Sequence, residues 1–215
     1  MRFFLANKPA SADQGMQYLP SVALPASSGH IPNDEECFAL WRKYAMLPNV
    51  QRHSLLVAHI ATQIASDLFA AGCPVDCAAI RASALLHDLA KTYCLHHGGG
   101  HAQLGAAWVV AETRNFALAQ GVFLHVWWPW PVPEGKDLAL LPLIVLYADK
   151  RARHDTCVPL DDRFEDLLQR YGTSKGAQES INASFAQSRE IEKNLSLLTG
   201  RNLHEDTFDS GRLVK

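Results

Sequence analysis

The sequence predicts an all-α protein, and three observations support this class. Apolar residues recur at helical spacing through most of the chain from Pro32 onward. Start and stop signals, chiefly Asn-Asp, Pro and Gly, divide the chain into segments of helix length. Strand signals are nearly absent, because the one strand-like run, residues 142–147, is extended to helix length by its flanks. We therefore expect a helical bundle of about seven to eight helices.

The first half of the predicted bundle follows from local signals. An Asn-Asp start opens the first helix and Pro48 ends it. Apolar residues four apart, from Leu56 to Leu68, form one stripe of the second helix, which Gly72 ends. Asp76 is a plausible N-cap for the third, and a run of three glycines separates it from the fourth. The expected segments are residues 33–46, 49–72, 75–91 and 101–114.

The second half is predicted in the same way. A short apolar helix ends at the proline-rich stretch 129–133. A strongly apolar helix follows and ends in a charged run. The next segment has Pro159 at its start, acids in its first turn and Gly172 at its end. The expected segments are residues 116–126, 136–154, 159–172 and 177–200.

Length and composition suggest one domain with appended segments. The chain has 215 residues, of which 48% are apolar, so a sizeable core can be buried. Residues 1–30 are rich in Pro, Ser, Ala and Gly and are expected to form a poorly ordered arm, or a strap on the surface. Residues 31–158 are expected to form the core, and residues 159–215 a C-terminal helical extension packed on it.

Charge and cysteine usage restrict the location and the partners. The formal net charge is −2 and basic residues are not concentrated, which argues against a general nucleic-acid surface while leaving a local basic pocket open. The five cysteines form no Cys-x-x-Cys pair and are expected to be free thiols in a reducing cytosol. We see no signal peptide and no apolar run near the ~20 residues that span a bilayer. The predicted location is cytoplasmic, with no membrane partner.

Histidines and aspartates stand at the ends of apolar segments, where unpaired charge is costly. His87 and Asp88 follow the apolar run 82–86, and a bound metal is one standard way to satisfy such buried polar groups. Taken singly, each could be a structural residue. His59 lies roughly opposite His53 on its helix and is expected to be exposed or a capped core histidine. Together, the set on five consecutive helices predicts a metal site: His53, His87, Asp88, His101, His125 and Asp149.

This order of ligands resembles the HD-domain metal-dependent phosphohydrolases. The matching sequence segments are RHSLLVAHIA, ALLHDLAK, HAQLGA, FLH and YADK, and the resemblance covers roughly residues 35–155. It is most similar to the six-ligand, two-metal branch that includes bacterial symmetrical diadenosine tetraphosphate hydrolases. The His-Asp-x-x-Lys form also resembles the HD-GYP phosphodiesterases, but the chain has no Gly-Tyr-Pro tripeptide. The resemblance identifies residues 31–158 as an HD-domain core.

The resemblance implies a role for each ligand. His53, His87 and Asp149 would hold one metal, His101 and His125 the second, and Asp88 would bridge them. Imidazole and carboxylate ligands suit Fe, Mn, Co or Zn better than Mg. Two such ions can hold a hydroxide and clamp both ends of a phosphoryl displacement. Asp88 and Lys91 are the expected catalytic residues.

Other residues are candidates for substrate contact, each with a structural alternative. Lys91, one turn after His87, is placed to reach a phosphate oxygen, or it is a cation favoured by the helix C-terminus. Solvated surface charge is the alternative for the other cations. Trp127 and Trp128 would form a stacking wall for a nucleobase, or a hydrophobic plug. The set of substrate-contact candidates is Lys91, Arg52, Lys150, Arg153, Trp127 and Trp128.

The predicted function is metal-dependent hydrolysis of a phosphoester or phosphoanhydride in a nucleotide or related small phosphorylated compound. The expected nucleophile is a metal-bound hydroxide. The alternatives are a non-catalytic HD module that senses a nucleotide, and a di-iron oxygenase. A homodimer is possible.

Overall fold

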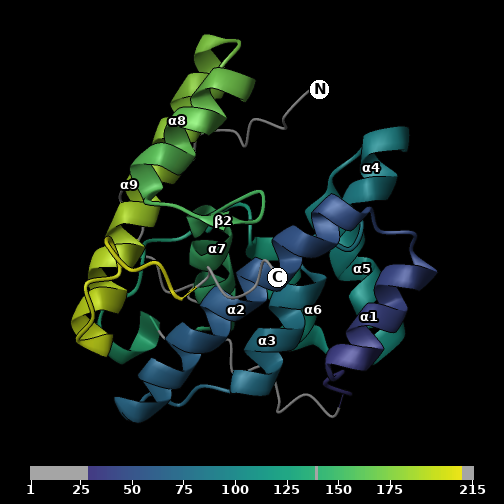
Figure 1. The fold of residues 1–215 in the computed structure, drawn as a ribbon, viewed down its shortest axis with the longest axis horizontal. Helices are drawn as coiled ribbons and strands as arrows, with labels where there is room; N and C mark the ends of the chain where they lie inside the picture. The colour runs from purple at the N-terminus through teal and green to yellow at the C-terminus, as the bar shows by residue number, and fades with distance from the viewer. Residues whose placement is uncertain (1–28, 139, 210–215) are drawn as a thin grey trace, which may run out of the picture.

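The structure is a computed structural model that describes residues 29–138 and 140–209. Helices make up nearly all of the described secondary structure, so the all-α class is confirmed. Figure 1 shows a bundle of helices with a long hairpin of two helices along one side. The expected arm, residues 1–30, lies outside the described residues except for its last two.

Most of the helices follow one another with short connections. In chain order they are α1 (Asp34–Lys43), α2 (Pro48–Ala70), α3 (Cys77–Leu86), α4 (Lys91–His97), α5 (His101–Thr113), α6 (Phe116–Leu124), α7 (Leu141–Arg151), α8 (Leu160–Tyr171) and α9 (Lys175–Thr199). The long connection lies between α6 and α7. A 3₁₀ turn, η1 (Gly135–Leu138), precedes α7, and two antiparallel two-residue strands, β1 (Ala152–Arg153) and β2 (Thr156–Cys157), follow it.

The core is built on α2, α3, α6 and α7, which pack on one another. The predicted stripe of α2 is buried, with Ile60, Ile64 and Leu68 fully enclosed. Nearly all of α7 is buried, including its charged C-terminal residues. An apolar helix enclosed on all sides can carry polar groups only where they have partners, so the end of α7 is a place to look for a site.

The predicted start signals act as caps. Asn33 forms a capping box with Glu36 at the start of α1, and the Asp76 carboxylate accepts a hydrogen bond from the backbone N–H of Ala79 at the start of α3. Gly98, in the expected glycine loop, has a φ of 78°, a conformation that glycine adopts without strain. This loop turns the chain so that His101 becomes the first residue of α5.

Two features differ from the expected elements. The segment predicted as one helix over residues 75–91 ends at Leu86, turns through residues 87–90 and restarts as α4. The turn places His87 and Asp88 off the end of α3, with both side chains fully buried. The segment predicted as a helix up to residue 154 ends at Arg151, because the chain turns into the β1–β2 hairpin.

The C-terminal segment packs on the core through α9. A buried network joins α9 to α7: the Tyr147 hydroxyl donates to Glu192, and Arg151 donates to the Tyr147 hydroxyl and to the Val158 carbonyl. Helix α8 pairs with α9, and the Phe164 and Phe185 rings lie 4.9 Å apart. Within the described ranges, no helix combines the length and the apolar character needed to cross a membrane.

Candidate metal centre

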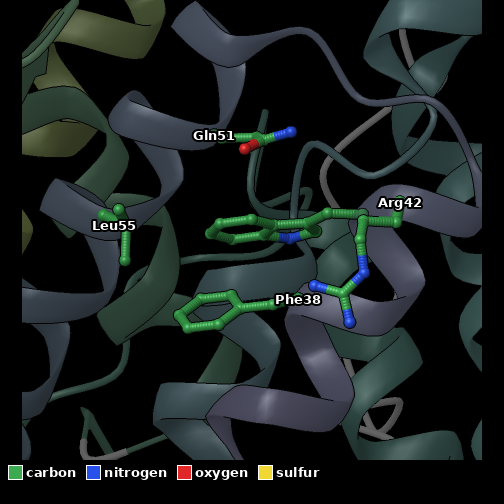
Figure 2. A pocket seen from close by; sticks show the side chains of 5 residues that line it. Phe38, Arg42, Gln51 and Leu55 are labelled. Atoms are coloured by element: carbon green, nitrogen blue, oxygen red, sulfur yellow. The ribbon is translucent and has the colours of Figure 1, made fainter.

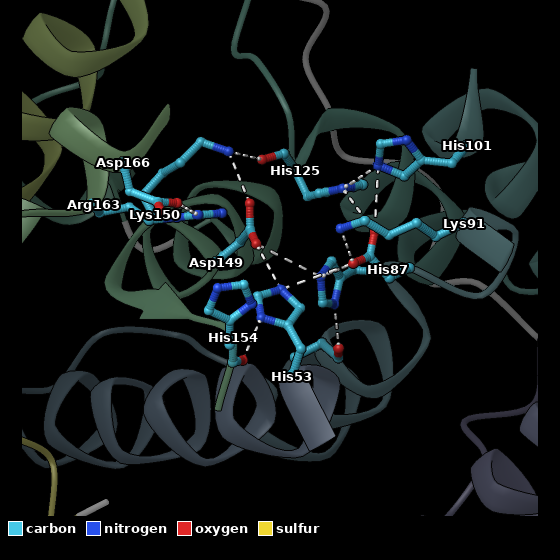
Figure 3. Close-up of polar contacts among 12 residues, drawn as sticks. His53, His87, Lys91, His101, His125, Asp149, Lys150, His154, Arg163 and Asp166 are labelled. Carbon is cyan, nitrogen blue, oxygen red and sulfur yellow. Dashed lines mark hydrogen bonds and ion pairs between the residues drawn. The ribbon is translucent and has the colours of Figure 1, made fainter. Parts of the chain in front are cut away.

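Six side chains from five segments of the chain meet inside the bundle, and Figure 3 shows five of them labelled. Five of them are buried, and the sixth, His101, has a side chain that is 27% exposed. Each stands at a helix end or in the turn that follows one, apart from His53, which lies in the second turn of α2. The structure thus brings together all the ligands that the sequence predicted: His53, His87, Asp88, His101, His125 and Asp149.

Asp88 lies at the centre, and its two carboxylate oxygens face different histidines. Oδ2 lies 3.4 Å from Nε2 of His87 and 3.8 Å from Nε2 of His53. Oδ1 lies 3.3 Å from Nε2 of His101 and 3.8 Å from Nε2 of His125. Each oxygen therefore belongs to a separate group of nitrogen donors, which is the arrangement that a bridging carboxylate requires.

Asp149 completes the first group. Its Oδ1 lies 3.0 Å from Nε2 of His53 and 3.8 Å from Nε2 of His87. Ligand atoms of His53, His87 and Asp149 all lie within 4.8 Å of one another, and so do those of His87, Asp88 and His125. Such spacing lets one ion of ordinary coordination distance contact all three members of a group.

Backbone carbonyls fix the orientation of three imidazoles. Nδ1 of His53 lies 3.0 Å from the His154 carbonyl, Nδ1 of His87 lies 2.7 Å from the Ala84 carbonyl, and Nδ1 of His125 lies 2.6 Å from that of Val122. A carbonyl can only accept, so Nδ1 donates and carries the proton. In the neutral rings, Nε2 is then an unprotonated acceptor, and all three Nε2 atoms point at the carboxylates.

In the cluster, hydrogen-bond acceptors therefore face one another: the Nε2 atoms of the neutral histidines and the carboxylate oxygens. A metal ion fits such a site if the facing atoms have no other partner. Nε2 of His87 and Oδ1 of Asp88 are buried and have no hydrogen-bond partner among the described residues. Buried polar atoms without partners are costly. Either protons or metal ions must lie between these lone pairs. The residues present fit a divalent cation, because imidazole and carboxylate are ligands for Fe, Mn, Co or Zn.

Two lysines neutralise the carboxylates. Nζ of Lys91 lies 2.6 Å from Oδ2 of Asp88, and Nζ of Lys150 lies 2.8 Å from Oδ2 of Asp149. Lys150 also donates to the His125 carbonyl at 3.4 Å, and its side chain is buried. Lys150 thus holds Asp149 and His125 in place, whereas the side chain of Lys91 is 39% exposed and stands at the edge of the cluster.

Burial and neighbouring charge set the protonation states. Burial alone would raise the pKa of Asp88, but His87 and Lys91 outweigh it and hold that pKa well below its usual value. The pKa of Asp149 is likewise lowered, because Lys150 and His53 outweigh its burial. Burial lowers the pKa of His101 and, more strongly, that of His125, which favours their neutral forms, the forms that can coordinate a metal.

His87 behaves in the opposite way. Its burial opposes the charged form, but Asp88 and Asp149 outweigh this effect and raise its pKa. A proton on His87 therefore takes the place that a metal ion would take between this imidazole and the carboxylates. Metal and protons compete for the same lone pairs.

The remaining predicted substrate residues lie at different depths. Arg52 is exposed and its Nε lies 3.5 Å from Asp155, while Arg153 is half-buried in β1. Trp127 is 43% exposed. Trp128 is 3% exposed, its indole N–H donates to the Pro131 carbonyl, and its ring centroid lies 4.8 Å from that of Trp130. Trp128 is thus packed as a plug, and of the two tryptophans only Trp127 offers a free ring face.

Sequence reasoning did not find two features beside the cluster. The His154 carbonyl, which orients His53, belongs to the hairpin turn between β1 and β2, where His154 has a φ of 59°. Arg163, in the first turns of α8, is drawn beside Lys150 and Asp149 in Figure 3. A cation near a helix N-terminus interacts unfavourably with the helix dipole. The position of Arg163 in the predicted helix 159–172 was therefore the one sequence feature that could have marked it as unusual.

A separate cavity of about 360 Å³ lies between α1 and α2 (Figure 2). Its lining residues are Phe38, Trp41, Arg42, Gln51 and Leu55. It shares no residue with the histidine and aspartate cluster, and its walls are mainly apolar and aromatic. The cavity therefore adds no residue to the candidate metal centre.

A helical bundle that encloses four histidines and two aspartates at its helix ends defines a candidate divalent-metal centre. Residues 50–153 match the family model described as HD domain. This match supports assignment to the HD-domain superfamily, and it contains every residue of the cluster. An HD domain suggests metal-dependent phosphohydrolase activity in general, divalent-metal binding and a small-molecule substrate. Comparison with curated proteins and with solved structures gave no significant match.

Proposed function

We propose that this protein is a two-metal phosphohydrolase that cleaves a phosphoester or phosphoanhydride of a nucleotide or related small compound. One observation carries the proposal: the two oxygens of Asp88 face two different groups of imidazole nitrogens. A mononuclear site needs only one such group. In the proposed assignment His53, His87 and Asp149 hold one ion, His101 and His125 hold the other, and Asp88 contacts both. The kinship with symmetrical diadenosine tetraphosphate hydrolases stays a prediction.

The metals and the side chains would divide the work. Two bound divalent ions supply Lewis acidity and lower the pKa of a coordinated water. The protein directs Nε2 of three histidines inward, because their Nδ1 N–H groups donate to the carbonyls of His154, Ala84 and Val122. It also keeps Asp88 and Asp149 ionised, because their lowered pKa values hold them in the charged form at neutral pH.

Lys91 is the proposed contact to the phosphate. Its side chain is at the edge of the cluster, and its pKa is raised because the Asp88 and Asp149 carboxylates outweigh its burial. Lys91 is therefore charged across the neutral range. If Asp88 held a metal ion, the Lys91 ammonium group would be free to donate to a phosphate oxygen.

Trp127 is the proposed contact to a base. It lies two residues after His125 and leaves 43% of its surface exposed. An exposed indole two residues from His125 would offer a stacking face for a nucleobase, an interaction of about 1–3 kcal/mol per base. This contact favours nucleotides over simple phosphate esters.

The experiment is a phosphate-release screen on protein purified without chelator and loaded in turn with Fe, Mn, Co and Zn. Substrates should include mononucleotides, dinucleoside polyphosphates and a simple phosphate ester, with metal content measured on the same samples. Release that requires metal and is lost in Asp88→Asn supports a hydrolase. Protein that binds nucleotide without releasing phosphate is a sensing module. Oxygen consumption by the iron-loaded protein, without phosphate release, identifies an oxygenase.

A further inference from the structure

Arg163 stands beside the metal cluster but belongs to the C-terminal segment. It lies in the first turns of α8, outside the residues 50–153 that match the HD domain. Helix α8 packs against α7, the helix that carries Asp149 and Lys150. Figure 3 shows Arg163 and Asp166 on the side of Asp149 and Lys150, away from His101 and Lys91.

The guanidinium of Arg163 has little to bind. Its side chain is 15% exposed, and its buried Nε has no hydrogen-bond partner among the described residues. Its contact with Asp166 is long, at 3.5 Å, and Asp166 is held more closely by Arg170 at 2.9 Å. A largely buried cation with an unpaired N–H is costly unless a further anion reaches it.

Lys91 and Arg163 lie on opposite sides of the cluster, with His87 and Asp149 between them (Figure 3). Both side chains are cations, so one ligand can contact both of them only if it extends across the cluster. A ligand that satisfies both must carry negative charge at more than one point.

We propose that Arg163 binds a phosphate group of the substrate that lies beyond the metal-bound phosphate. The guanidinium would donate its free N–H groups to oxygens of this second phosphate. The substrate class is then a phosphoanhydride, with linked phosphates, and not a monoester. This inference rests on the proposed function, since it assumes that the first phosphate sits at the metals.

The test measures binding, so it does not depend on turnover. Metal-loaded full-length protein is titrated with methylenediphosphonate, which has two phosphorus groups that cannot be hydrolysed, and with orthophosphate. Arg163→Gln should weaken diphosphonate binding by about tenfold or more, the scale of a lost charge-assisted hydrogen bond, and orthophosphate binding less. Arg163→Lys, which keeps the charge, should retain most of the affinity.

Arg170→Gln is the matched control, because it removes the same charge from the same helix and frees the same Asp166 carboxylate. It should leave both affinities within about twofold of wild type. Metal content and melting temperature are measured on every sample. The proposal is overturned if Arg163→Gln changes neither affinity, weakens both ligands equally, or loses metal. If wild type releases no phosphate from any substrate while diphosphonate binding still depends on Arg163, the hydrolase proposal fails and this one stands.

Discussion

Asp88 is the residue through which the two halves of the cluster are connected. It is fully buried, and its two oxygens lie 3.3–3.8 Å from four imidazole nitrogens. His87 and Lys91 keep it ionised. A single carboxylate in this position determines both the charge of the site and the spacing of any two ions held there.

Asp88→Asn should remove the activity while leaving the fold intact. The amide keeps the shape but loses the charge, so we expect turnover to fall by roughly a hundredfold or more, the scale of one preorganised electrostatic group. Metal content should fall from two ions to one or none. Asp155→Asn is the control, since Asp155 is a half-exposed aspartate paired with Arg52. Normal turnover in Asp88→Asn would show that this carboxylate is not a bridge.

Lys91→Ala should separate metal binding from catalysis. Its ammonium lies 2.6 Å from Asp88 Oδ2, the oxygen that faces His53 and His87, so it competes with a metal ion for that oxygen. The variant should bind metal at least as tightly as wild type and turn over more slowly, through KM if the phosphate contact is equal in the ground and transition states. Metal titration and steady-state kinetics measure both. Lys175→Ala, at an exposed lysine on α9, is the control and should change neither metal affinity nor turnover. Weaker metal binding in Lys91→Ala would show that Lys91 does not compete with a metal ion for Asp88.

At the scale of helices, α5 must be held in place for His101 to reach Asp88. Its C-terminal turn is tied to α1: Nζ of Lys43 lies 2.7 Å from Oε1 of Glu112, and the Tyr44 hydroxyl donates to the same oxygen at 2.6 Å. The Tyr44 ring also stacks on Trp108, with centroids 4.2 Å apart. The α1–α5 contact therefore combines a stacked aromatic pair with a charged clamp.

Glu112→Gln should destabilise the fold in a pH-dependent way. The hydrogen bonds from Lys43 and Tyr44 lower the pKa of Glu112 below its usual value of 4.5. A depressed folded-state pKa gives stability that is present above the unfolded-state pKa and lost as pH falls through the folded-state value. The variant should lose about 0.5–1 kcal/mol at pH 7, the range for partly exposed ion pairs. Denaturant unfolding from pH 7 to 3 measures the free energy of unfolding of both proteins. The difference between them should shrink below pH 4.5, and a difference that stays constant with pH would contradict this role of Glu112.

The sequence predicted the helices well where the signal was local. Apolar spacing and caps placed α1, α2 and α5, because these elements are specified by residues a few positions apart. The break between α3 and α4 was missed, since apolar periodicity continues through residues 82–90 and the turn depends on contacts that His87 and Asp88 make with distant helices. The β1–β2 hairpin was missed because each strand has only two residues.

The candidate site was predictable as a set of residues but not as an arrangement. Polar residues at the ends of apolar runs marked the six side chains that the structure brings together, and their binding of metal stays a prediction. The different environments of the two Asp88 oxygens, and the opposite burial of the neighbours Trp127 and Trp128, depend on three-dimensional packing. Arg163 was missed because its place beside the cluster depends on how α8 packs against α7, which a signal local to α8 does not predict.

At the scale of the whole molecule, a metal ion bound at the cluster would be coupled to folding. It draws ligands from α2, α5, α6, α7 and the turn after α3, so an ion bound there joins most of the bundle. In the unfolded chain these ligands are far apart and bind metal weakly. Binding free energy at such a site therefore becomes folding free energy.

Removal of metal should lower the melting temperature. Metal at a hundredfold excess over its Kd contributes about 2.7 kcal/mol, which corresponds to a shift of about 5–10 °C for a chain of this length. In His87→Ala the chelator should lower the melting temperature by less than in wild type, because the variant has lost a ligand of one of the two proposed ions. His59→Ala is the matched control, because His59 is a half-buried histidine that contacts the Phe208 carbonyl and lies outside the cluster. In His59→Ala, chelator should lower the melting temperature as much as it does in wild type. If chelator lowered the melting temperature equally in wild type and in His87→Ala, this would count against a metal at the cluster.

The most direct measurement is the anomalous scattering of a crystal of the manganese- or iron-loaded protein. We expect two anomalous peaks about 3.5–4 Å apart, one beside each oxygen of Asp88. The first should lie within about 2.0–2.3 Å of His53, His87 and Asp149, and the second at the same distance from His101 and His125. No peak within bonding distance of Asp88, or a single peak that touches only one of its oxygens, would contradict a two-metal centre.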